Sequence, residues 1–125
     1  MNPQPEGNEK MGRLSTHVLD TAEGCPAEGV AIRLYSMAQQ REQLADTTTN
    51  SDGRTEEPLL YGDAMVTGTY ELEFDIGDYF RSRKAAVDDP AFLDTVVIRF
   101  SVKHDEHYHV PLLCSPWAYS TYRGS

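Results

Sequence analysis

Three segments of the chain alternate apolar and polar residues, which is the pattern of a β-strand with one buried face. Their apolar members are Val30, Ile32 and Leu34; Tyr70, Leu72 and Phe74; and Val96, Ile98, Phe100 and Val102. In the second segment, 67–74, the alternating partners are acidic. We therefore expect an antiparallel strand there, with one face packed on a core and the other in water.

Four further segments have the length and composition of short strands: 14–19, 40–49, 107–114 and 117–123. Turn-forming residues separate them, at 20–26, at 50–53 and at Ser115-Pro116. Six to eight short strands without an internal repeat predict an all-β fold, a two-sheet β-sandwich.

Only segment 75–84 has the pattern of a helix. Asp75 or Asp78 is expected to cap its first turn, and its last turn carries Arg81, Arg83 and Lys84, in the order that the helix dipole favours. Residues 1–12 contain few apolar side chains, so we expect a disordered tail, followed by one domain over 13–125.

The chain of 125 residues carries a net charge of −9, which argues against a nucleic-acid partner. No apolar run approaches the length of a membrane span, and no membrane partner is expected. Two cysteines are too few for a disulfide scaffold, so we expect a reducing compartment, the cytoplasm. The chain does not end in the peroxisomal Ser-Lys-Leu signal, although an N-terminal peroxisomal signal stays open.

Two histidines lie on strand faces that the alternation does not assign to the core. His17 shares its face with Ser15 and Leu19, while His109 lies opposite to a core face of Tyr108, Val110 and Leu112. If both strands belong to one sheet, the two imidazoles lie on one outer face, where they are suited to acid–base catalysis near neutral pH.

Other chemistries remain open at this point. His104, His107 and His109 are close in sequence, and a pair two residues apart on a strand can bind zinc. Cys25 and Cys114 are potential nucleophiles, although Cys114 falls on the core face and neither has a base at a recognisable spacing. Surface histidines without any function are also common.

Four motifs resemble the 5-hydroxyisourate hydrolase family of transthyretin-like enzymes. LSTHVLDT at 14–21 with GCPA at 24–27 is similar to its first signature, and HYHVPLLCSP at 107–116 to its second. NSDGRT at 50–55 resembles the loop that supplies an arginine, and the final YRGS resembles the family's C-terminal tetrapeptide. The resemblance covers 13–125 in order and spacing.

This resemblance implies a transthyretin-like sandwich of about eight strands with one short helix, assembled as a homotetramer. It implies catalytic roles for His17, Arg54, His109 and Ser125, substrate binding by Tyr122, Arg123 and Gly124, and a peripheral place for His107. The implied reaction is hydrolytic opening of 5-hydroxyisourate in urate degradation, without a metal or organic cofactor. The alternative is a transthyretin-like hormone carrier that lacks catalysis.

Overall fold

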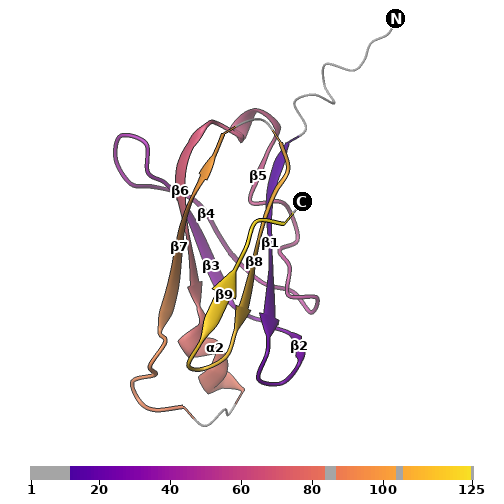
Figure 1. Ribbon diagram of the computed structural model, residues 1–125, viewed down its shortest axis with the longest axis vertical. Coiled ribbons are helices and arrows are strands. Elements are labelled where there is room, and N and C mark those ends of the chain that lie inside the picture. The colour runs from indigo at the N-terminus through magenta and orange to yellow at the C-terminus, as the bar shows by residue number, and fades with distance from the viewer. Residues whose placement is uncertain (1–11, 84–86, 104–105, 125) are drawn as a thin grey trace, which may run out of the picture.

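Two β-sheets face each other across a core in the computed structural model, which describes residues 12–83, 87–103 and 106–124 (Figure 1). The first sheet has the order β2-β1-β8-β9, with β5 also paired to β1, and the second has the order β4-β3-β6-β7. The strands of the first sheet are β1 (Arg13–Asp20), β2 (Cys25–Pro26), β5 (Leu60–Tyr61), β8 (Tyr108–Cys114) and β9 (Tyr119–Thr121). Those of the second are β3 (Ala31–Ser36), β4 (Glu42–Thr48), β6 (Gly68–Asp75) and β7 (Thr95–Val102).

The predicted β-sandwich is therefore confirmed, and each of the seven expected strands exists. The alternation did not predict the two-residue strands β2 and β5, nor the short 3₁₀ helix η1 (Gly62–Ala64), because such short elements carry no periodic signal. The expected tail of the first twelve residues falls almost entirely outside the described part of the chain.

The predicted helix is α2 (Ile76–Ser82), at one end of the sandwich. Asp75 is its N-cap residue, as expected by position, but its side chain makes no capping hydrogen bond. The carboxylate instead accepts two hydrogen bonds from Arg33 on β3 and one from Thr95 on β7. The Asp75 side chain thus forms an ion pair with Arg33 across the sheet and does not cap the helix.

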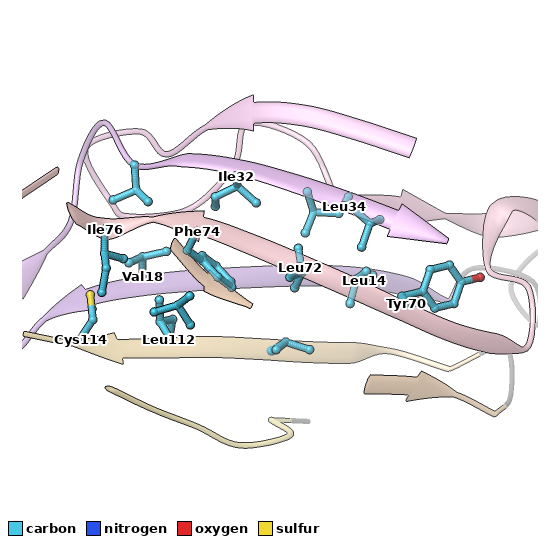
Figure 2. Close-up of a cluster of buried hydrophobic side chains, with 14 of the residues drawn as sticks. Leu14, Val18, Ile32, Leu34, Tyr70, Leu72, Phe74, Ile76, Leu112 and Cys114 are labelled. Atoms are coloured by element: carbon cyan, nitrogen blue, oxygen red, sulfur yellow. The ribbon is translucent and has the colours of Figure 1, made fainter. Parts of the chain in front are cut away.

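The core lies between the two sheets and is built from the faces that the alternation predicted (Figure 2). Its fully buried side chains include Leu14 and Val18 from β1, Ile32 and Leu34 from β3, Leu72 and Phe74 from β6, and Leu112 from β8. Each such side chain contributes about 1.5–3 kcal/mol when it leaves water, so this interior is the main source of stability.

The outer face of β1 and β8 is what positions the candidate site. The two strands run parallel, with Leu14 opposite Tyr108 and Ser15 opposite His109. Because Leu14 and Tyr108 point into the core, their neighbours Ser15 and His109 point together to the outside. The same alternation places His17 on that outer face.

Candidate active site

Two imidazole rings lie side by side on the outer face of the first sheet. The ring centroids of His17 and His109 are 6.5 Å apart, with the planes tilted by 42°. Both side chains are only partly exposed, in agreement with their predicted place on a face that is not the core. The parallel pairing of β1 and β8 thus joins two residues that are 92 positions apart in the sequence.

The ring of His17 is fixed by a backbone carbonyl group. Its Nε2 lies 2.8 Å from the carbonyl oxygen of Asp52. A carbonyl oxygen can only accept a hydrogen bond, so Nε2 must carry the proton. In the neutral ring Nδ1 therefore keeps its lone pair, and this atom can accept a proton from a reacting group.

Residues 50–54 form a tight loop that brings Asp52 and Arg54 to the histidines. The side-chain oxygen of Asn50 accepts hydrogen bonds from the backbone N–H groups of Asp52 and Arg54. The backbone N–H of Asn50 donates in turn to the carbonyl of Arg54. The loop is fastened to β1 where the N–H of Val18 donates to the carbonyl of Gly53 over 2.8 Å. The site therefore depends on the NSDGR segment as a folded unit.

Gly53 is the residue that permits this attachment. Its φ of +77° lies in the left-handed region, and a Cβ atom placed there would lie 2.4 Å from the carbonyl oxygen of Val18 and 3.3 Å from Cδ2 of His17. A side chain would thus be strained and would also push the loop off the strand.

A depression of about 580 Å³ opens beside His109. Its lining includes Arg13, Ser15, Arg54, Glu56, Glu57 and His107. Among the described residues, Arg13 and Arg54 have no carboxylate within salt-bridge distance, whereas Arg33, Arg41, Arg81, Arg83, Arg99 and Arg123 each have one. In so acidic a chain, two unpaired guanidinium groups in one depression indicate a place for an electron-rich ligand.

His109 is held in a different way from His17. Its Nδ1 lies 2.9 Å from the hydroxyl oxygen of Ser15, the residue directly opposite on β1. Burial lowers the pKa of His109, and the positive charges that Arg54 and His17 can carry lower it further. His109 is accordingly neutral at physiological pH and can either accept a proton or donate one from an uncharged ring.

The chain beyond β9 continues alongside β8 (Figure 1). Its last described residue, Gly124, forms an antiparallel β-bridge with His109. The N–H of Gly124 donates to the carbonyl of His109 over 2.7 Å. A Cβ atom on Gly124 would lie 2.9 Å from Cδ2 of the imidazole, so only glycine allows this approach. Gly124 therefore lies in the candidate site, in direct contact with His109.

Two other C-terminal residues lie elsewhere. The guanidinium of Arg123 stacks 4.0 Å from the ring centre of Tyr108 and pairs with Glu106, an anchoring role at the end of the strand. Tyr122 lines a smaller groove of about 260 Å³ beside Ile98 on β7, and is not among the residues of the histidine depression. Ser125 lies outside the described residues.

The alternative chemistries receive little support in the part of the chain that the structure describes. The only three potential metal ligands found close together there are Asp20, Glu23 and Cys25, and they include neither His107 nor His109. His104 falls outside the described residues. Cys114 is buried, as predicted, and burial together with nearby Asp20 raises the pKa of its thiol to about 12, which leaves it protonated and unreactive.

Sequence reasoning did not assign a role to Arg13, to Ser15 or to the carbonyl group of Asp52. Arg13 and Ser15 share a strand face with His17 by alternation, so the signal for them was present. The carbonyl of Asp52 has no sequence signal, because a backbone atom acts there.

Across 12–83, 87–103 and 106–124, no helix has the length and apolar character needed to cross a membrane.

The model of the HIUase/Transthyretin family matches residues 14–124. Among curated relatives, 5-hydroxyisourate hydrolase of Pseudomonas aeruginosa is 54% identical over 125 residues, which cover 98% of this chain and 95% of the relative. 5-Hydroxyisourate hydrolase 2 of Rhizobium meliloti is 57% identical and covers 93% and 98% of the two chains.

Solved structures give the same picture. (S)-Allantoin synthase matches with a TM-score of 0.90 at 43% identity over 96% of this chain, which spans about half (46%) of that longer chain. Klebsiella pneumoniae 5-hydroxyisourate hydrolase matches with a TM-score of 0.77 at 34% identity, covering 92% and 100% of the chains. Sea bream transthyretin in complex with thyroxine matches with a TM-score of 0.79 at 26% identity, covering 90% and 94%.

Proposed function

The chain belongs to the HIUase/Transthyretin family and is a hydrolase of 5-hydroxyisourate, and we propose that its active site is built around His17, Arg54 and His109. In the reaction, water attacks a carbonyl carbon of the six-membered ring. The bond from this carbon to the ring nitrogen breaks, and the nitrogen takes up a proton. The product is 2-oxo-4-hydroxy-4-carboxy-5-ureidoimidazoline. The reaction is a step in urate degradation.

The observation that supports this site most strongly is the pair of imidazoles, of which His109 lines an open depression together with the unpaired Arg54 and His17 lies next to it. Hydrolysis of a ring amide needs a base for the water, a positive group for the developing oxyanion and a donor for the departing nitrogen. The residue types and their spacing meet all three needs without a metal ion or an organic cofactor.

His17 is the base in this proposal. Its Nδ1 has the free lone pair, and the carbonyl oxygen of Asp52 holds the opposite nitrogen. When Nδ1 takes the proton from water, the ring becomes positive and its hydrogen bond to Asp52 becomes charge-assisted. A positioned base of this kind contributes about 10²–10⁴ to the rate.

His109 and Arg54 act on the substrate side. The neutral ring of His109 donates from Nε2 to the substrate, since burial and neighbouring positive charge keep it uncharged. Arg54 offers a planar fork of donors to the oxygens of a flat heterocycle, a geometry that lysine cannot reproduce. Arg13, which lines the same depression, adds a second positive group for the substrate.

The C-terminal segment completes the site as a wall against His109. Gly124 makes that contact directly, and Arg123 fastens the segment to Tyr108. Ser125 follows in the sequence and is proposed to supply a hydroxyl group to the substrate. Tyr122 is proposed to bind substrate across a subunit boundary, because its ring is exposed and lines the neighbouring groove of its own chain.

The proposed assembly is a homotetramer, as the resemblance to transthyretin-like proteins implies. The histidine depression is open to one side in a single chain, and a second subunit laid over it would exclude water and strengthen each polar contact. Sharing of the site between symmetric copies would also make activity depend on association.

A carrier function is the competing proposal, since a transthyretin bound to thyroxine has the same fold. The rings of His107 and His109 and the guanidinium groups of Arg13 and Arg54 line the depression and make it polar, whereas an apolar ligand requires an apolar wall. The experiment that separates the two follows the decay of freshly made 5-hydroxyisourate by absorbance, with and without the protein, and measures thyroxine binding in parallel. Faster decay supports hydrolysis, while thyroxine binding without faster decay supports a carrier.

A further inference from the structure

Among the described residues, the side chain of Ser15 makes one hydrogen bond, and its partner is a histidine of the active site. Its hydroxyl oxygen lies 2.9 Å from Nδ1 of His109. The two residues are direct partners in the parallel pairing of β1 and β8, so the sheet itself sets this distance. Both also line the histidine depression. The contact is therefore part of the site and not a remote feature of the fold.

The direction of this hydrogen bond follows from which acceptors are within reach. A hydroxyl group has one proton to donate, and half-buried polar protons without an acceptor are costly. Nδ1 of His109 is the one side-chain hydrogen-bond partner that Ser15 has among the described residues. If Nδ1 donated instead, the proton of Ser15 would lose this partner. Donation by Ser15 leaves the ring proton of neutral His109 on Nε2.

The remaining surroundings of the ring fit this arrangement. Gly124 closes on Cδ2 from the C-terminal segment, and its N–H fixes the backbone of His109. Ser15 thus holds one edge of the ring while Gly124 limits its movement on another. Nε2 is the nitrogen of His109 for which no protein hydrogen bond is recorded in the described chain.

We propose that Ser15 is a positioning residue, whose hydroxyl group donates to Nδ1 of His109 and so keeps the ring proton on Nε2 for donation to substrate. The assignment rests on the proposed function for its catalytic meaning. The contact of His17 with the carbonyl of Asp52 keeps the proton of that ring on Nε2 and leaves a lone pair on Nδ1. The two imidazoles therefore offer the substrate opposite groups, a lone pair from His17 and a proton from His109. One ring is ready to accept a proton and the other to donate one.

The proposal predicts the direction of a change in titration. The groups around His109 that can carry charge are His17 on β1, Arg54 on the loop after β4, and the lining residues Arg13, Glu56, Glu57 and His107. All of them remain when Ser15 is replaced. A hydrogen bond donated to Nδ1 stabilises the neutral ring, so its loss raises the pKa of His109.

The experiment compares Ser15→Ala with Ser15→Thr, which retains a hydroxyl group, and with Ser101→Ala, which removes a hydrogen-bonded serine from β7 in the other sheet. NMR titration of the His109 ring reports its pKa in each folded variant, and steady-state assays report kcat and KM. We expect Ser15→Ala to raise the pKa of His109 and lower kcat about 3- to 10-fold with KM nearly unchanged. Ser15→Thr and Ser101→Ala should match the parent protein.

The results separate this inference from the function on which it rests. An unchanged or lowered pKa of His109 in Ser15→Ala overturns the positioning role, as does an equal shift in Ser15→Thr. These outcomes do not depend on turnover. If the parent protein fails to hydrolyse 5-hydroxyisourate, the proposed function is lost, while the titration still decides whether Ser15 controls the ring.

Discussion

Replacement of Gly53 by alanine tests whether the loop that carries Arg54 must be fastened to β1. The new Cβ would lie 2.4 Å from the carbonyl oxygen of Val18, and 3.3 Å from both the N–H nitrogen of Ala27 and Cδ2 of His17. The loop must therefore move, at the cost of the hydrogen bonds from Val18 to Gly53 and from Ala27 to Val18.

The expected loss of stability combines three effects. A left-handed backbone costs about 1–2 kcal/mol for a residue with a side chain. Each of the two backbone hydrogen bonds contributes about 1 kcal/mol. Alanine returns about 0.4–1 kcal/mol by restricting the unfolded chain. The free energy of unfolding should thus fall by about 2–3.5 kcal/mol.

Urea unfolding at one fixed protein concentration measures this change, and the hydrolysis assay measures its effect on the site. Gly29→Ala is the matched control, because Gly29 also has a positive φ of 89° but has open space where its Cβ would lie. Displacement of Arg54 and of the Asp52 carbonyl should lower kcat/KM of Gly53→Ala about 100-fold, with little change in Gly29→Ala. Equal stability and full activity in both variants would refute the role of this close approach.

Three further predictions concern other parts of the molecule. Deletion of residues 122–125 should abolish activity with little loss of stability, because no described residue among them belongs to the core; near-native kcat/KM in a folded deletion variant would count against the C-terminal wall. The Arg33 guanidinium holds the pKa of Asp75 below its usual value, so this pair stabilises the fold above about pH 4, the pKa of an unfolded aspartate, and loses its effect as the pH falls. In Asp75→Asn, the free energy of unfolding measured against pH should therefore fall less steeply at acid pH than in the parent protein. The same slope in both proteins would contradict this. A thiol reagent at pH 8 should label Cys25 in the native protein and Cys114 only after denaturation, and rapid native labelling in a Cys25→Ser variant would contradict the burial of Cys114.

The sequence predicted the fold well where the chain alternates strictly. Residues on β6 and β7 face the core or the solvent as their alternation requires, because one buried face imposes a period of two. An exception is Glu71, which is only 8% exposed, since Arg99 on the neighbouring strand β7 and Arg41 just before β4 pair with it. Ion pairs of this kind depend on which strands become neighbours, and a single strand pattern does not contain that information.

For the site, the sequence predicted the face of His17 and of His109 but not their partners. The contact between Ser15 and His109 requires the parallel register of β1 with β8, whose paired residues are 94 positions apart in the chain. The contact of His17 with Asp52 requires the loop to fold back on β1, and its acceptor is a backbone atom. The resemblance implied that Tyr122 binds substrate, but alternation gives no direction for its ring, because β9 ends at Thr121; in the single chain Tyr122 lines another groove.

The account depends above all on two imidazoles that share the proton transfers of one hydrolysis. The most direct measurement is the turnover of 5-hydroxyisourate by His17→Ala and by His109→Ala, each compared with His107→Ala from the exposed end of the same depression. Both site variants should remain folded and lose at least about 100-fold in kcat, while His107→Ala should retain most of its activity. Equal losses in all three variants, or full turnover in either site variant, would contradict the account.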